Sequence, residues 1–217
     1  MTSKRLLTLI EKGENQNLEF KQRFSSFNKI AKEFIAFANT NGGIVLFGVE
    51  DDGSIYGVES EKEETELIKE TAENYCEPPI NYNIDFVPLY DKEVVVVKVV
   101  ESESKPHRIQ DYKSELDLNS AEVFIRVNDK SLPAGKEMIK ILQANYDNKK
   151  LINYAIGKTE QMVFNLLNEH ETISVAELSK LANVSNRRAS RALIKMVRAN
   201  LLAIHVKDNG ESYFTTL

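Results

Sequence analysis

Three acidic residues near the start of the chain are candidates for binding a divalent metal ion. Glu14 and Glu19 flank or occupy the first predicted strand, and Asp51 follows the next buried strand. If these two strands are neighbours in one sheet, the three carboxylates can meet at one end of it. Carboxylate oxygens suit Mg²⁺ or Mn²⁺, and such an ion can activate water and stabilise a phosphodiester under attack. Acidic residues at strand ends are also common in proteins that bind no metal, so the spacing alone leaves both alternatives open.

A second group of candidates lies on one predicted helix near the C-terminus. Its basic residues recur at intervals that place them along one side of a helix. They are Arg187, Arg191, Lys195 and Arg198, with Arg188 beside them. Such a stripe can neutralise phosphates, and Arg187 and Arg188 at the helix start can reach guanine in a major groove. The alternative is a solvated charged face on a domain used for dimerisation or protein contact. Lys207 lies in the hairpin that follows. It either contacts the phosphate backbone of a nucleic acid or is a turn residue that only increases solubility.

The composition is that of an ordinary globular protein. The 217 residues include 28 Lys and Arg, 33 Asp and Glu, and one cysteine, and the formal net charge is -5. No stretch is long and apolar enough for a transmembrane helix, and the first apolar run is too short for a signal peptide. A single cysteine excludes a disulfide framework and a cysteine-based zinc site. We therefore expect a cytoplasmic protein without membrane association.

The first two thirds of the chain predict an α+β domain with its boundary near residue 147. Apolar residues recur at helical spacing in four segments, residues 3–12, 28–38, 63–75 and 136–144. Alternating or continuous apolar runs predict strands at residues 18–24, 44–49, 55–58, 82–87, 93–100 and 123–127. Residues 101–120 are polar and are expected to form a long loop.

Two details of this domain concern the candidate residues. Alternation along the first strand places Leu18, Phe20 and Phe24 on one face and Glu19, Lys21 and Arg23 on the other. Asn28 is the expected N-cap of the following helix, and Gly42 and Gly43 are expected to end it.

Residues 151–217 predict a separate small domain. Its segments are helices at residues 159–168, 175–181 and 186–200 and strands at 201–206 and 212–215. Asn209-Gly210 predicts a tight turn between the two strands, because both central positions of the favoured hairpin turn need positive φ. Three helices followed by a hairpin is the order of a winged helix-turn-helix domain. The polar segment 145–150 is the expected junction between the two domains.

Three segments together resemble the AlbA_2 domain, the core of the Schlafen family. They are Glu14–Lys21 (ENQNLEFK), Phe37–Gly53 (FANTNGGIVLFGVEDDG) and Phe124–Ser131 (FIRVNDKS) followed by Pro133-Ala134. The resemblance covers about residues 3–145 and implies a mixed-sheet α+β fold. One departure is Asn128, where glycine is usual. In bacteria and archaea such domains often precede a winged helix and are described as DNA-binding or ATP-binding regulators. The glycines here match no nucleotide-binding motif.

The resemblance also implies a chemistry. In Schlafen proteins with nuclease activity, three carboxylates of these motifs cut tRNA and rRNA with Mg²⁺ or Mn²⁺. By motif position they correspond to Glu14, Glu19 and Asp51, which are therefore the implied metal-binding and catalytic residues. Lys21 matches the family's motif lysine and is implied to hold a phosphate, with an ion pair near Glu19 as the alternative. The vertebrate core holds two such lobes and this chain one, so a matching groove requires a homodimer.

We therefore predict a Schlafen-like domain that acts as a metal-dependent endoribonuclease on structured RNA such as tRNA, followed by a winged helix that binds nucleic acid. One alternative is a non-enzymatic transcription regulator, in which the winged helix binds DNA and the first domain dimerises or senses a ligand. Another is a protein-interaction adaptor whose basic helix face is only solvated. The sequence does not distinguish RNA from DNA as the physiological target.

Overall fold

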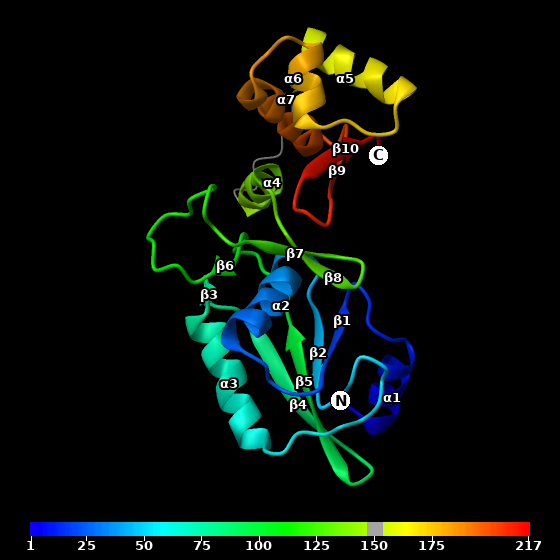
Figure 1. The fold of residues 1–217 in the computed structure, drawn as a ribbon, viewed down its shortest axis with the longest axis vertical. Helices are drawn as coiled ribbons and strands as arrows, with labels where there is room; N and C mark the ends of the chain where they lie inside the picture. Colours follow the sequence, from blue (N-terminus) through cyan, green and yellow to red (C-terminus); the bar gives the residue numbers. More distant parts are fainter. Residues whose placement is uncertain (147–153) are drawn as a thin grey trace. The chain divides into compact units, whose positions relative to one another are not determined.

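The chain divides into two units with separate hydrophobic cores. The computed structural model describes residues 1–146 and 154–217, and its contacts group Met1–Leu132 in one unit and Pro133–Leu217 in the other (Figure 1). The predicted domain boundary, between residues 147 and 151, lies outside the described residues. No helix among the described residues is long and apolar enough to cross a membrane.

A mixed four-stranded sheet, in the order β1-β2-β5-β4, forms the centre of the first unit. β1 (Leu18–Lys21) and β2 (Gly43–Phe47) are parallel neighbours. β5 (Lys92–Val99) is antiparallel to β2 on one side and to β4 (Tyr82–Leu89) on the other. The valine-rich sequence of β5 suits a strand that is covered on both faces. Because β1 and β2 are adjacent, the condition for the three predicted carboxylates to approach one another is met.

Helices cover both faces of this sheet. α1 (Ser3–Glu11) packs on one face, where Leu6 joins side chains such as Phe20 and Val96 in a buried cluster. α2 (Phe27–Asn39) and α3 (Glu61–Asn74) pack on the other face, against side chains such as Val97. The two clusters take alternate residues of the central strands, as the period of two along a strand requires.

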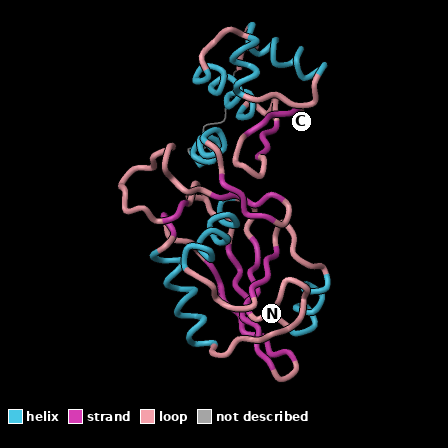
Figure 2. The backbone as a smooth tube through the Cα atoms, viewed as in Figure 1, coloured by secondary structure: helices cyan, strands magenta, loops and turns pink. Residues whose placement is uncertain are grey.

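Two small sheets complete the first unit. β3 (Cys76–Glu77) pairs with β6 (Arg108–Ile109), and β7 (Phe124–Val127) pairs with β8 (Lys130–Pro133). β7 also packs against α2. The chain between β5 and β7 is mostly loop, as the polar composition predicts (Figure 2).

The first predicted strand is shorter than expected, and this changes which way its side chains point. β1 ends at Lys21, so the alternation stops before Phe24. Phe24 packs with the α2 and α3 cluster, on the opposite side from Leu18 and Phe20. Among the charged residues that were expected to share the other face, Glu19 is buried at 7% exposed, Lys21 is half-buried and Arg23 is exposed.

Three further local predictions are wrong in detail. The N-cap of α2 is Ser26, whose hydroxyl accepts from the backbone N–H of Lys29 at 3.4 Å, so Asn28 lies inside the helix. Residues 55–58 form no named strand, and only an isolated bridge joins Ile55 to Val49. Of Asn209 and Gly210, only Gly210 has positive φ, because the hairpin connection is longer than a two-residue turn.

The second unit contains helices followed by a hairpin. The elements are α4 (Lys136–Tyr146), α5 (Lys158–Glu169), α6 (Val175–Leu181), α7 (Asn186–Arg198), β9 (Ala203–Val206) and β10 (Ser212–Thr215). Ser174 begins α6 with a reciprocal capping box, and the hydroxyl of Ser185 caps α7. Leu178 of α6 and Leu193 of α7 are buried in the same core. The short break between these helices includes Asn183 with positive φ, a conformation that asparagine tolerates.

Candidate functional site

Glu14 lies in the loop before β1, and its backbone contact fixes it against that strand. Its Oε1 accepts a hydrogen bond from the backbone N–H of Phe20 at 2.8 Å. The pKa of Glu14 is raised, first by burial, and further by the negative charges of Glu19 and Asp51. The Phe20 hydrogen bond and the charge of Lys21 act in the opposite direction. Such charge effects fall off with distance. Glu19, Lys21 and Asp51 therefore lie close enough to Glu14 to change the pKa of its carboxyl.

Glu19 is held by two cations. Its Oε1 forms an ion pair with the Nζ of Lys21, and its Oε2 accepts from the Nη1 of Arg126 at 2.8 Å. Both carboxylate oxygens are therefore engaged with positive charge. For Lys21 the structure shows the ion pair, while phosphate binding stays a prediction.

Asp51 is exposed at the turn that follows β2. It lines a cavity of about 430 Å³ between α1 and this turn, with Ile10 and Phe20 among the apolar residues of its wall. The cavity offers space beside one of the three carboxylates.

The three carboxylates do not form a ready metal site. Within residues 1–146 and 154–217, no group of three or more His, Cys, Asp or Glu side chains is arranged to hold a metal ion. Each oxygen of Glu19 already accepts from one cation, Lys21 or Arg126, and these positive charges disfavour a metal ion beside it. The oxygen donors are of the type that Mg²⁺ and Mn²⁺ prefer. Glu19 can join Glu14 and Asp51 around one ion with the second lone pair of either oxygen.

Arg126 belongs to a buried cluster that the sequence did not reveal. Its Nη1 also lies 3.2 Å from both Glu33 Oε2 and Ser131 Oγ, and its Nη2 donates to the carbonyl of Asn15 at 2.8 Å. A usable signal was present: Arg126 lies between the apolar residues of a short strand. Glu33 likewise occupies the apolar stripe of α2, three residues after Ile30 and four before Phe37. A charged residue on a buried stripe requires a buried partner.

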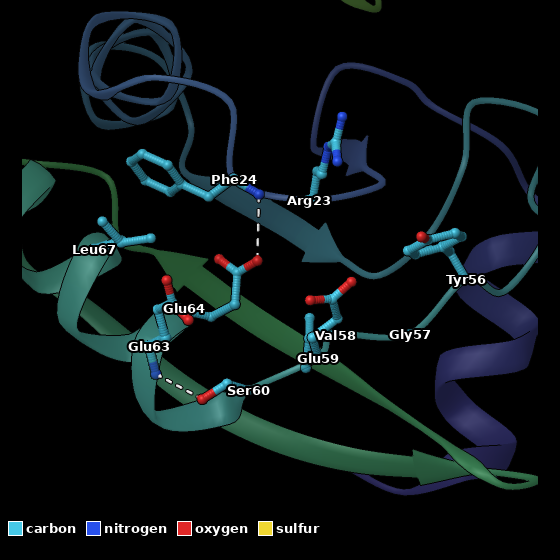
Figure 3. Close-up of a pocket in the computed structure, with 10 residues that line it drawn as sticks. All are labelled: Arg23, Phe24, Tyr56, Gly57, Val58, Glu59, Ser60, Glu63, Glu64 and Leu67. Carbon is cyan, nitrogen blue, oxygen red and sulfur yellow. Dashed lines mark hydrogen bonds between the residues drawn. The ribbon is translucent and has the colours of Figure 1, made fainter.

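A separate pocket of about 180 Å³ lies between the end of β1, residues 56–60 and the start of α3 (Figure 3). Glu64 accepts from the backbone N–H of Phe24 at 3.2 Å, and burial raises the pKa of its carboxyl. Glu59, Glu63 and Glu64 outnumber Arg23 among the charged residues that line this pocket. The excess of negative charge disfavours a phosphate here.

The basic residues of α7 lie on its solvent side. Arg187, Arg188, Arg191 and Lys195 are exposed, and Arg198 is half-buried. The opposite side of the helix is buried, and Ser190 there donates to Glu137 Oε1 at 2.7 Å. Within the described part of the chain, Arg187, Arg188 and Arg191 have no acidic partner in an ion pair. Lys207, near the hairpin turn, lies 3.9 Å from Glu211.

Comparison with known proteins gives one family match and one curated relative. The family model described as Schlafen, AlbA_2 matches residues 14–135. An uncharacterized ATP-binding protein of Ureaplasma parvum serovar 3 is 30% identical over 132 residues, which cover 52% of this chain and 37% of the relative. The chain thus corresponds to well under half the length of that relative.

Seventeen chains of solved structures match this protein, and two of them show the likeness at low identity. The N-terminal domain of a RecG-related protein from Nitrosomonas europaea has a TM-score of 0.41 at 18% identity, covering 54% of this chain and 84% of that one. A protein of Corynebacterium diphtheriae has a TM-score of 0.45 at 15% identity, covering 93% of this chain and 34% of that one. The family match spans more than half of the chain and includes Glu14, Glu19 and Asp51, so this protein belongs to the Schlafen AlbA_2 family.

Proposed function

We propose that this protein binds nucleic acid, and that helix α7 of the second unit makes the principal contact. The order α5, α6, α7 and hairpin β9–β10 is that of a winged helix-turn-helix domain, in which the second helix of the pair enters the major groove. The observation that carries the proposal is the exposed basic face of α7, where Arg187, Arg188 and Arg191 lack acidic partners among the described residues.

The chemistry of this face suits a phosphate backbone with bases beneath it. Arg187 and Arg188 lie in the first turn of α7, the part of a recognition helix that contacts base edges. Arg191 and Lys195 follow on the same side, where they can neutralise phosphates. Lys207 in the hairpin can add a further phosphate contact in exchange for its pairing with Glu211.

The test is the salt dependence of binding to short RNA and DNA duplexes. We expect the double variant Arg187→Ala/Arg191→Ala to bind more weakly and to lower the slope of log K against log salt by about 1 for each phosphate that is no longer neutralised. The matched control is Lys62→Ala/Lys69→Ala, which removes the same charge from α3. If both variants bind with the wild-type slope, α7 is not the interface. The preferred polymer shows whether RNA or DNA is the target.

A second function, metal-dependent cleavage of structured RNA such as tRNA, is favoured by the shared neighbourhood of the carboxylates. Burial raises the pKa of Glu14 most, and the negative charges of Glu19 and Asp51 raise it further. A cation bound between the three carboxylates would relieve the repulsion between those charges. Mg²⁺ or Mn²⁺ bound there would supply Lewis-acid activation of water and phosphate. A phosphate that pairs with Lys21 would draw its positive charge away from Glu19, which would favour a metal ion at that carboxylate.

Cleavage is tested with purified protein, tRNA and Mn²⁺. We expect activity that a chelator abolishes and that Glu19→Gln and Asp51→Asn each reduce by roughly 100-fold or more, because removal of a ligand takes away several kcal/mol of transition-state stabilisation. Asp52→Asn is the control, since it alters the adjacent exposed acid and keeps an acceptor for the backbone N–H of Ser54. Equal activity in all four proteins would show that these carboxylates are not catalytic.

A further inference from the structure

Arg126 contacts both ends of the segment that carries two of the candidate carboxylates. Its Nη1 donates to Glu19 Oε2 in β1, and its Nη2 donates to the carbonyl of Asn15, the residue next to Glu14; both distances are 2.8 Å. Glu14 in turn accepts from the backbone N–H of Phe20, beside Glu19. The guanidinium and the Phe20 hydrogen bond therefore act together with the backbone bridge between Asn15 and Leu18 to fold the loop before β1 back along the strand.

The position of this guanidinium is set by groups outside that segment. Its carbon lies 4.7 Å from the centre of the Phe37 ring of α2, which orients the guanidinium plane. Glu33 of α2 and Ser131 of β8 each lie 3.2 Å from Nη1. The side chain is 1% exposed, so water does not compete for these contacts. Arg126 thus contacts both α2 and the β7–β8 hairpin, and through its hydrogen bond to Glu19 it holds β1 in place relative to them.

The charges of the cluster also balance. Arg126 and Lys21 face Glu19 and Glu33, so neither buried carboxylate lacks a cation. Arginine suits this position because its planar guanidinium can donate to Glu19 and to Asn15 at the same time. A lysine has a single ammonium group on a flexible chain, so it is less able to hold both partners in fixed positions.

We infer that Arg126 is a positioning residue for the carboxylate site, which sets the placement of Glu14 relative to Glu19. Its part in catalysis rests on the proposed RNA cleavage, whereas its part in positioning can be measured without any activity. Mutation of a residue that orients a metal ligand through a hydrogen bond typically lowers metal affinity or activity by about 10- to 100-fold. We therefore expect kcat to fall by roughly that factor when Arg126 is changed.

The experiment compares Arg126→Lys with Arg108→Lys in the full chain. Arg126→Lys keeps the buried positive charge and loses the two-partner geometry. Arg108→Lys makes the same change at another buried arginine, whose guanidinium donates to Asp111 and to the carbonyl of Lys113 and contacts neither Glu19 nor Asn15. The first measurement is hydrogen exchange of the Phe20 amide, which reports directly on the position of Glu14. The second is the kcat and KM of tRNA cleavage with Mn²⁺, and thermal unfolding is recorded for each protein.

The expected result is that Arg126→Lys speeds exchange of the Phe20 amide by about tenfold while global unfolding stays near wild type, since local opening and global unfolding are separable. In the same variant kcat falls and KM changes little, and Arg108→Lys shows neither effect. Wild-type protection of Phe20 in Arg126→Lys, or equal loss of protection in both variants, would overturn the inference. Absence of cleavage by the wild type would refute the proposed cleavage alone, because the exchange comparison still decides the positioning.

Discussion

Glu14 is an acidic side chain held in a partly buried place beside two other acids. Burial, then Glu19 and Asp51, raise the pKa of Glu14 above its ordinary value of 4.5. A raised carboxyl pKa means that the ionised form is less favourable in the folded protein than in the unfolded chain. The folded state is therefore favoured by this group at pH values below its unfolded pKa, and that contribution is lost as the pH rises through the folded pKa.

Glu14→Gln is accordingly expected to raise stability at neutral pH. The amide oxygen can still accept from the Phe20 backbone N–H, and the repulsion from Glu19 and Asp51 is removed. Because the group is partly exposed and screened, the gain is less than about 1 kcal/mol. Thermal unfolding of wild type and variant should differ near pH 7 and converge near pH 3.5, where Glu14 is protonated. A variant that is less stable at pH 7 would indicate that the carboxylate is engaged by a cation instead.

The candidate residues were identified from their positions in the family motifs. Asn128 departs from one of these motifs, because glycine is usual at that position. Asn128 lies in the turn between β7 and β8 with φ of 56°, the conformation for which glycine is otherwise preferred. Asparagine tolerates this region better than most residues. The turn that positions Arg126 and Ser131 therefore forms without the usual glycine.

At the scale of elements, the close contact of Gly43 with α2 positions the strand that precedes Asp51. An ideal Cβ on Gly43 would lie 2.2 Å from Cδ1 of Phe37, and that ring is fully buried. The glycine at this position thus permits β2 to lie directly against the helix. Gly42 before it has φ of 70°, in agreement with its expected place at the helix end.

Gly43→Ala is expected to destabilise the first unit by about 1–3 kcal/mol, the usual cost of overpacking a core. The measurement is denaturant unfolding followed by tyrosine fluorescence or circular dichroism. Combining Gly43→Ala with Phe37→Leu should cost less than the sum of the two single changes, because the smaller side chain leaves room for the methyl group. Strictly additive costs would show that the contact with Phe37 is not the cause.

The elements that sequence patterns predicted poorly are the short ones. The helices and the longer strands were located to within a few residues, because their apolar periodicity extends over several turns or pleats. β3, β6 and β8 have two to four residues each and carry no such periodicity. β8 nevertheless matters for the candidate site, since Ser131 contacts Arg126.

At the scale of the whole molecule, the homodimer stays a prediction from the resemblance, which gives this chain one Schlafen-like lobe where the vertebrate core has two. Light scattering on the purified chain is expected to give twice the mass of one chain, and dilution below the dimer dissociation constant should reduce RNA cleavage. A monomer that cleaves tRNA at every concentration would show that one lobe is sufficient. A monomer that binds nucleic acid without cleaving it would favour the regulator.

The sequence by itself determined the family, the order of the main elements and the three acidic positions, because motifs and apolar periodicity are local properties of the chain. Only the tertiary structure decided the state of those acids. Glu19 is neutralised by Arg126, 107 residues away in sequence, and this pairing depends on how β7 packs over α2 beside β1. Coulomb interactions between buried groups are set by distances of a few ångströms in space. No local pattern encodes such distances for residues on different elements.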